Sequence, residues 1–145
     1  MRAGPLPWRD PLLWLALAAP LPLWAALAWH GGAAGPAWIA EHPGRFVLLV
    51  LAYPVLEEIV FRGMIQDWLL GRLPPRRVLG ISTANATASL LFALAHLPAH
   101  PPLWAAAVFV PSLVYGFFYE HTRALAAPVL LHVWYNLGWF TLFGA

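Results

Sequence analysis

The sequence predicts an all-α polytopic membrane protein, with about five transmembrane helices forming a compact bundle. Among its 145 residues, 61% are hydrophobic and only 10% are charged. Soluble domains carry about 25% charged residues, so this composition indicates a chain surrounded by lipid. The apolar residues also gather into five runs, each near the roughly 17–25 residues that a helix needs to cross a bilayer.

In chain order, the five runs predict helices at about Leu12–Trp29, Phe46–Leu70, Ser82–Leu97, Leu103–Tyr119 and Ala124–Phe143. The first run contains Pro20 and Pro22, which predict a kink or a break because proline removes a backbone donor and crowds the preceding turn. This run is longer than the apolar region of a signal peptide, and no clear small-residue cleavage site follows it, so we expect a retained helix. The Pro-Pro pairs at 74–75 and 101–102 predict loops.

All eight basic residues are arginines, and their distribution predicts the orientation of the chain. With the N-terminus inside, one side of the membrane holds Arg2, Arg9, Arg72, Arg76, Arg77 and Arg123. The other side holds Arg45. Because arginine-rich loops stay in the cytoplasm, we expect a multi-pass membrane protein with a cytoplasmic N-terminus and an external C-terminus. The longest run of basic residues is Arg76-Arg77. A nucleic-acid surface would need a larger basic cluster, so the expected partner surface is lipid.

Several polar residues fall inside the predicted helices, where each charged side chain costs roughly 2.5–3.5 kcal/mol. They are Glu57, Glu58 and Arg62 in the second run, Asn85, Ser89 and His96 in the third, and His132 and Asn136 in the fifth. A small bundle needs few polar clamps, so this set favours function over helix packing alone. By contrast, Glu120, His121 and Arg123 are expected to be solvated at the cytoplasmic end of the fourth run.

The adjacent glutamates are expected to have different roles. Glu58 and Arg62 lie at i,i+4 with the acid first, which is the favoured orientation for an ion pair within one helix. Glu57 projects about 100° away around the helix, and no basic residue lies three or four positions from it. Because a carboxylate in a low-dielectric environment can act as a general base near neutral pH, Glu57 is the candidate base.

The histidines leave two classes of function open. His132 and Asn136 share one helix face at i,i+4 spacing and could either hold helices together or donate hydrogen bonds to a reacting group. His132 could also form a proton relay with His96 and Glu57 in a small ion conductor or transporter. The chain has no cysteine, which excludes a disulfide, a thiolate metal site and a cysteine nucleophile.

Three motifs occur in order within the apolar runs: EExxxR at Glu57–Arg62, FxxxH at Phe92–His96 and HxxxN at His132–Asn136. In this order, they resemble the CPBP family of CAAX prenyl proteases and bacteriocin-processing enzymes, also called the Abi family. The resemblance covers about residues 45–145. It predicts a catalytic helical core at 45–145, preceded at 1–44 by a cytoplasmic stub, the first transmembrane helix and an external loop.

The resemblance implies a glutamic-type intramembrane protease with its active site inside the bundle. Glu57 would activate a water molecule as general base, and His96 would help to hold that water. His132 and Asn136 would form the oxyanion site. Peptide hydrolysis needs such a base, a captured water and donors aimed at the developing oxyanion. The other candidates are supporting residues, first Glu58 and Arg62 and then Asn85, Ser89 and Phe92.

The resemblance also sets expectations for cofactor and substrate. No cofactor is expected, although two histidines, a glutamate and an asparagine leave a zinc site as an alternative. Small bacterial members of the family imply a C-terminal sorting-signal protease of the JDVT-CTERM or myxosortase-like kind. Its substrate would be a membrane-anchored protein with a C-terminal sorting tail or helix. A prenyl-protein (CAAX) endopeptidase is the alternative subtype, and an ion conductor or a catalytically silent scaffold or immunity protein are the alternatives outside proteolysis.

Overall fold

The computed structural model describes residues 6–31 and 35–144. The chain forms two compact units. Of the described residues, one unit contains Leu6 and 57–128, and the other contains 7–31, 35–56 and 129–144. The EExxxR and FxxxH motifs belong to the first of these units, which we call the glutamate unit. The HxxxN motif belongs to the second, which we call the terminal unit.

The terminal unit is built from helices at both ends of the chain. They are α1 (Pro11–Ala18), α2 (Leu21–Gly31), α3 (Gly35–Glu41), α4 (Pro43–Val47), the π-helical segment η1 (Leu48–Ala52), most of α5 (Tyr53–Glu58) and most of α10 (Ala126–Phe143). The side chain of Asp10 caps α1 by accepting a hydrogen bond from the Leu12 amide at 2.9 Å. The break between α1 and α2 falls at residues 19–20, which confirms the prediction made from the two prolines.

The helix α10 is fastened to the first helix of the terminal unit by indole and phenol donors. Trp134 Nε1 donates to the Leu17 carbonyl and the Tyr135 hydroxyl donates to the Ala16 carbonyl, both at 2.8 Å. Gly138 lies against the ring of Trp24, where a Cβ would overlap the indole. The two hydrogen bonds satisfy the indole and phenol donors without water, as is required of polar groups on helices that face lipid.

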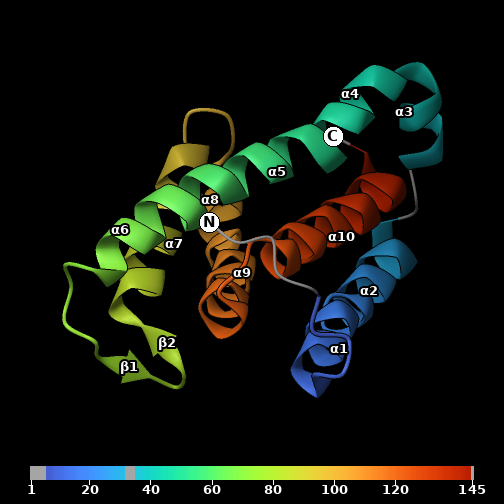
Figure 1. The fold of residues 1–145 in the computed structure, drawn as a ribbon. Helices are drawn as coiled ribbons and strands as arrows, with labels where there is room; N and C mark the ends of the chain where they lie inside the picture. Colours follow the sequence, from blue (N-terminus) through green and yellow to red (C-terminus); the bar gives the residue numbers. More distant parts are fainter. Residues whose placement is uncertain (1–5, 32–34, 145) are drawn as a thin grey trace. The chain divides into compact units, whose positions relative to one another are not determined.

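The glutamate unit is organised around α7, which packs against η2, α8 and α9. Its elements are η2 (Ile59–Gln66), α6 (Asp67–Leu70), β1 (Arg77–Val78), β2 (Ile81–Ser82), α7 (Thr83–His96), α8 (Pro102–Ala107) and α9 (Phe109–Thr122) (Figure 1). The Ser82 hydroxyl caps α7 by accepting from the Asn85 amide at 2.9 Å. Leu69, Ala84 and Ala88 form a small buried cluster between α6 and α7.

A close approach between helices makes Gly116 of α9 sensitive to substitution. A Cβ at this position would overlap the side-chain amide of Asn85 and crowd the Gln66 side chain. We therefore expect Gly116→Ala to lower the free energy of unfolding by about 1–3 kcal/mol, measured by thermal or denaturant unfolding in detergent micelles. The matched control is Gly71→Ala, whose Cβ would meet only the Trp68 carbonyl at an ordinary 3.7 Å. Equal effects of the two changes would contradict this packing argument.

All five apolar runs are helical, so the predicted all-α class is confirmed. Within the described residues, two helical runs are long and apolar enough to cross a membrane, Pro11–Gly31 and Pro102–Thr122, each of 21 residues. The helical run from Pro43 to Leu70 is also long enough to cross a membrane, but it carries charged residues in its middle. The number of transmembrane helices therefore stays a prediction. The domain division at residue 45 also stays a prediction.

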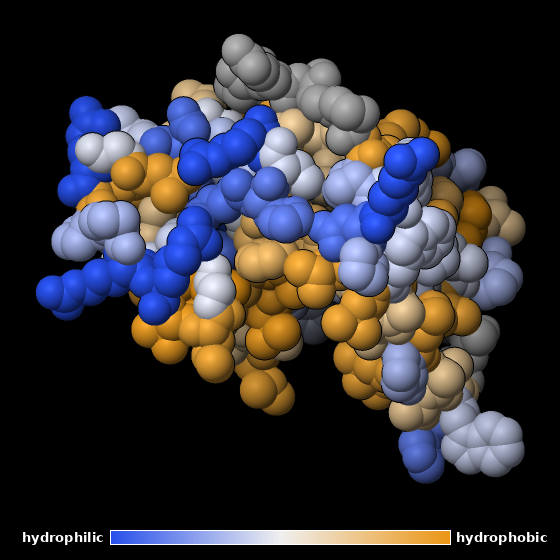
Figure 2. All heavy atoms as spheres, turned by 60° about the horizontal axis from the view of Figure 1, so that its bottom comes forward, coloured by the Kyte–Doolittle hydropathy of each residue, from blue (hydrophilic) through white to orange (hydrophobic). Residues whose placement is uncertain are grey.

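The surface has the character of a lipid-facing protein. Large apolar side chains are exposed on both units, among them Leu15, Leu23, Leu56 and Leu103. On the face shown in Figure 2, hydrophobic residues, coloured orange, cover wide areas. Exposed apolar area of this extent is unusual for a soluble monomer, and it is the expected surface of a protein solvated by acyl chains.

Candidate active site

The two glutamates lie between stretches of π-helical backbone. Glu57 and Glu58 end α5, with η1 before this helix and η2 directly after it. In a π-helix the amide bonds to the carbonyl five residues back, which widens the turn and rotates the side chains that follow. Such segments are frequent at functional sites. Glu58 is fully buried, whereas Glu57 is half-buried.

The predicted pairing of Glu58 with Arg62 is confirmed. Arg62 Nε donates to Glu58 Oε2 at 3.0 Å, and both side chains are fully buried. The guanidinium also donates from Nη1 to Gln66 Oε1 at 3.2 Å and from Nη2 to Ser112 Oγ at 2.6 Å. A buried guanidinium is tolerated only where its donors are satisfied, and these three partners meet that need.

The buried polar network extends beyond the motif to residues that the sequence analysis did not single out. Gln66 Nε2 donates to the Gly116 carbonyl at 3.0 Å and to Glu120 Oε1 at 2.9 Å. Glu120 also accepts hydrogen bonds from Ser82 and Arg77. The expectation that Glu120 is solvated is therefore wrong, because these donors hold the carboxylate in a buried position with 7% exposure.

A sequence signal for this network exists in the spacing. Glu58, Arg62 and Gln66 follow one another at i, i+4 and i+8, which places them on one side of their helix. On α9 the polar positions Ser112 and Glu120 also lie eight residues apart. Two polar stripes on two apolar helices predict a shared buried seam, since each would otherwise face hydrocarbon.

The FxxxH motif lies on α7, which packs against η2. The Phe92 ring meets the Phe61 ring edge-on at a centroid distance of 5.0 Å, and Arg62 Cζ lies 5.8 Å from the centre of the same Phe92 ring. The structure therefore brings EExxxR and FxxxH together on neighbouring helices.

Asn85 and Ser89 are buried on the same helix as Phe92. Ser89 Oγ donates to Asn85 Oδ1 at 3.1 Å, and Asn85 Nδ2 donates to the Leu113 carbonyl at 2.9 Å. The second bond ties α7 to α9. The supporting role of Asn85 and Ser89 at the site stays a prediction.

The tautomer of neutral His96 follows from a single hydrogen bond. His96 Nδ1 lies 2.8 Å from the Phe92 carbonyl, and a carbonyl can only accept. Nδ1 must then carry the proton, which leaves Nε2 of the neutral ring as an acceptor. The ring is half-buried, with centroids 4.6 Å from Phe92, 6.0 Å from His100 and 6.1 Å from Trp104. Partial burial and the neighbouring His96 lower the pKa of His100.

His132 and Asn136 lie on α10 in the terminal unit. His132 is buried with 5% exposure. Asn136 Nδ2 donates to the Leu49 carbonyl of η1 at 2.9 Å, which orients the amide while leaving its second N–H for another acceptor. The HxxxN motif is thus held within its own unit by a contact to the π-helical segment that precedes the glutamates.

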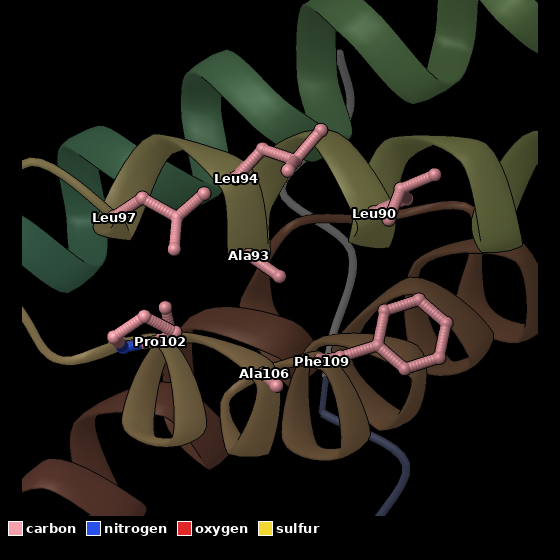
Figure 3. A pocket seen from close by; sticks show the side chains of 8 residues that line it. Leu90, Ala93, Leu94, Leu97, Pro102, Ala106 and Phe109 are labelled. Carbon is pink, nitrogen blue, oxygen red and sulfur yellow. The ribbon is translucent and has the colours of Figure 1, made fainter.

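A pocket of about 280 Å³ on the glutamate unit is apolar. Figure 3 shows its lining residues, with Leu90, Ala93 and Leu97 on one side and Pro102, Ala106 and Phe109 on the other. Ala93 and Leu94, two middle residues of FxxxH, line the pocket, but Phe92, His96 and the residues of EExxxR do not. Its walls therefore hold none of the polar side chains to which the motifs assign chemistry.

The sequence matches one protein-family model over residues 39–138, the Rce1-like type II CAAX prenyl endopeptidases. This chain belongs to that family. The match contains all three motifs and confirms the resemblance to CAAX proteases seen in the sequence. The apolar helices of the chain and its membership of this family together indicate an all-α membrane protein.

A curated relative supports the same family. The chain is 31% identical over 83 residues to the membrane-embedded CAAX protease MroQ of Staphylococcus aureus (strain USA300). The aligned part is 57% of this chain and 32% of that relative, so the chain spans about a third of the relative's length. No solved structure matches significantly.

The donor set of the candidate residues can be compared with what a metal site requires. In the ranges 6–31 and 35–144, no three or more His, Cys, Asp or Glu side chains gather as a metal site would require. His96 directs Nδ1 to its own helix, so Nε2 is the only ring nitrogen that could bind a ligand or a water. The expectation of a cofactor-free site stays a prediction.

Proposed function

We propose that this protein is a glutamic-type intramembrane endopeptidase that cleaves substrate proteins near a membrane-embedded or membrane-proximal C-terminal segment. Membership of the CAAX endopeptidase family and the similarity to a membrane-embedded CAAX protease support this proposal. The resemblance to small bacterial members of the family supports a bacterial inner membrane as its location. The arginine distribution supports a cytoplasmic N-terminus and an external C-terminus.

The observation that carries the proposal is the difference between the environments of the two glutamates. The charge of Glu58 is committed to Arg62 in a buried pair that also holds Gln66 and Ser112. Glu57 is half-buried at the end of α5, next to this rigid pair. Arg62 ties its helix to α9 through Ser112, and the carboxylate of Glu57 is the more accessible of the two. Such a group suits proton transfer, because a general base must be positioned and reachable.

In the proposed reaction, Glu57 removes a proton from water and the resulting hydroxide attacks the scissile carbonyl carbon. His96 Nε2 accepts a hydrogen bond from the same water and orients it. His132 and the second amide N–H of Asn136 donate to the oxyanion of the tetrahedral intermediate. When the C–N bond breaks, the protonated Glu57 gives its proton to the leaving amine, so the base is regenerated.

The proposed substrate is a membrane-anchored protein with a C-terminal sorting tail or helix. A small helical protein with apolar surfaces on both units can receive such a segment from the bilayer. A prenylated C-terminal peptide is the alternative substrate. The name of the matching family refers to prenyl substrates, which is the specific observation that keeps this alternative.

The test is cleavage in proteoliposomes that contain only the purified protein and a reporter substrate. Three reporters are compared: a C-terminal motif followed by a helix and arginines, a farnesylated CAAX peptide, and a soluble peptide with the same residues. We expect cleavage of the first reporter, unchanged by EDTA or 1,10-phenanthroline because no metal takes part. Cleavage of the farnesylated reporter alone would replace the substrate assignment. Loss of activity with both chelators, restored by zinc, would contradict the metal-free mechanism.

A further inference from the structure

A tight hairpin joins α6 to α7 in the glutamate unit. Strands β1 and β2 pair in antiparallel register, with Arg77 opposite Ser82 and Val78 opposite Ile81 (Figure 1). The two-residue loop is Leu79-Gly80, with φ of 51° and 83°. Two successive positive φ angles are the signature of a type I′ turn, for which Asn-Gly is the preferred pair. Leucine at the first position opposes this preference, since its side chain disfavours positive φ.

The side chain of Leu79 does not pack against the rest of the protein. Leu79 is 99% exposed and the adjacent Val78 is 75% exposed, so the tip of the hairpin is an apolar protrusion. Neither the turn geometry nor the core therefore explains leucine at this position. A contact outside the protein would explain both its strain and its exposure.

The chain around this tip is basic. Arg77 braces the turn by donating to the Gly80 carbonyl at 2.9 Å and pairs with buried Glu120. In the part of the chain that the structure describes, Arg72, Arg76 and Arg123 make no ion pair. Their positive charge is therefore available to a partner.

Next to the hairpin lies a pocket of about 220 Å³ with mixed walls. Arg77, Arg123 and Ser82 supply its polar side, and Leu70, Leu73 and Pro74 are among its apolar lining. Trp68 is half exposed nearby on α6, with the Arg72 guanidinium stacked on its ring at 4.1 Å. Arginine, tryptophan and exposed apolar side chains together are the composition of surfaces that sit at the boundary between headgroups and acyl chains.

We propose that the Val78–Leu79 hairpin tip and the pocket beside it form a binding site for an anionic phospholipid. The tip enters the acyl-chain boundary. Arg123, which lines the pocket, and the exposed Arg76, which directly precedes the lining Arg77, bind the headgroup phosphate. Charge complementarity supports lipid as the occupant. The surface around the hairpin carries arginines in excess and is the side expected to face the cytoplasm, where the membrane leaflet is anionic. The apolar tip distinguishes the site from one for free phosphate, which would use no exposed leucine.

The test uses the absence of native cysteine in the sequence. A Val78→Cys variant carries a single environment-sensitive fluorophore at the hairpin and is reconstituted in phosphatidylcholine vesicles, with or without phosphatidylglycerol. We expect phosphatidylglycerol to shift the emission to the blue. We also expect it to strengthen quenching by lipids spin-labelled near the headgroup severalfold and to weaken quenching by aqueous iodide.

Two further variants in the Val78→Cys background separate the apolar and the charged contributions. Leu79→Asn installs the preferred turn pair, so the hairpin should persist while lipid quenching falls severalfold. Arg76→Gln with Arg123→Gln should abolish the difference between the two vesicle compositions, and high salt should weaken it in the parent protein. The proposal is overturned if iodide quenches the label equally in both vesicles. It is equally overturned if Leu79→Asn leaves lipid quenching unchanged.

Discussion

Replacing Glu57 with glutamine is expected to lower the rate of peptide-bond hydrolysis by about 10²–10⁴-fold, because an amide cannot take a proton from water. The fold should persist, since Glu57 is only half-buried and the neighbouring Glu58–Arg62 pair remains intact. The measurement is single-turnover cleavage of the reporter in proteoliposomes, together with the thermal unfolding midpoint of the variant.

The adjacent carboxylate provides the matched control. Glu58→Gln makes the same chemical change one residue away, where it removes the negative charge that Arg62 contacts. Its main expected effect is a lower unfolding midpoint, whereas that of Glu57→Gln is a lower rate. Equal rates for the parent and Glu57→Gln would contradict the assignment of the base. A proton flux across the vesicle membrane that Glu57→Gln abolishes, without any proteolysis, would replace the protease with a proton conductor.

Local spacing was sufficient to predict the ion pair and the helical runs. Glu58 and Arg62 lie on one helix, so the i,i+4 rule determines their proximity without knowledge of the rest of the fold. The prolines at positions 20 and 22 predicted the break in the first run for the same reason. The π-helical segments around the glutamates were not predicted, because the wider turn is stabilised by tertiary contacts and leaves no periodicity of its own.

The environment of Glu120 could not be predicted from its position near a helix end. Its donors Gln66, Ser82 and Arg77 come from η2, β2 and β1, and they meet because η2 and β2 pack against α9 while β1 pairs with β2. The hairpin was missed because its strands are two residues long and its turn uses a leucine that local preference disfavours. The roles of His132 and Asn136 stay predictions from the motif.

The buried guanidinium of Arg62 should be the most costly side chain to remove. Arg62→Met leaves Glu58 without its cationic partner and removes donors to Gln66 and Ser112. We expect the free energy of unfolding to fall by about 3–5 kcal/mol, as for other broken buried ion pairs. Denaturant unfolding in micelles, followed by tryptophan fluorescence, measures this loss. Arg72→Met is the control, because this arginine is exposed and such surface changes usually stay within about 0.5 kcal/mol.

The double variant Glu58→Met/Arg62→Met separates stability from catalysis. Removing both charges leaves no buried carboxylate without its cationic partner. The double variant should therefore be more stable than Arg62→Met alone. Hydrolysis should nevertheless stay slow, because the pair that fixes the backbone beside Glu57 is gone. A double variant less stable than Arg62→Met would show that Glu58 is stabilised by groups other than the guanidinium. A double variant with the parent rate would show that the buried pair serves the fold alone.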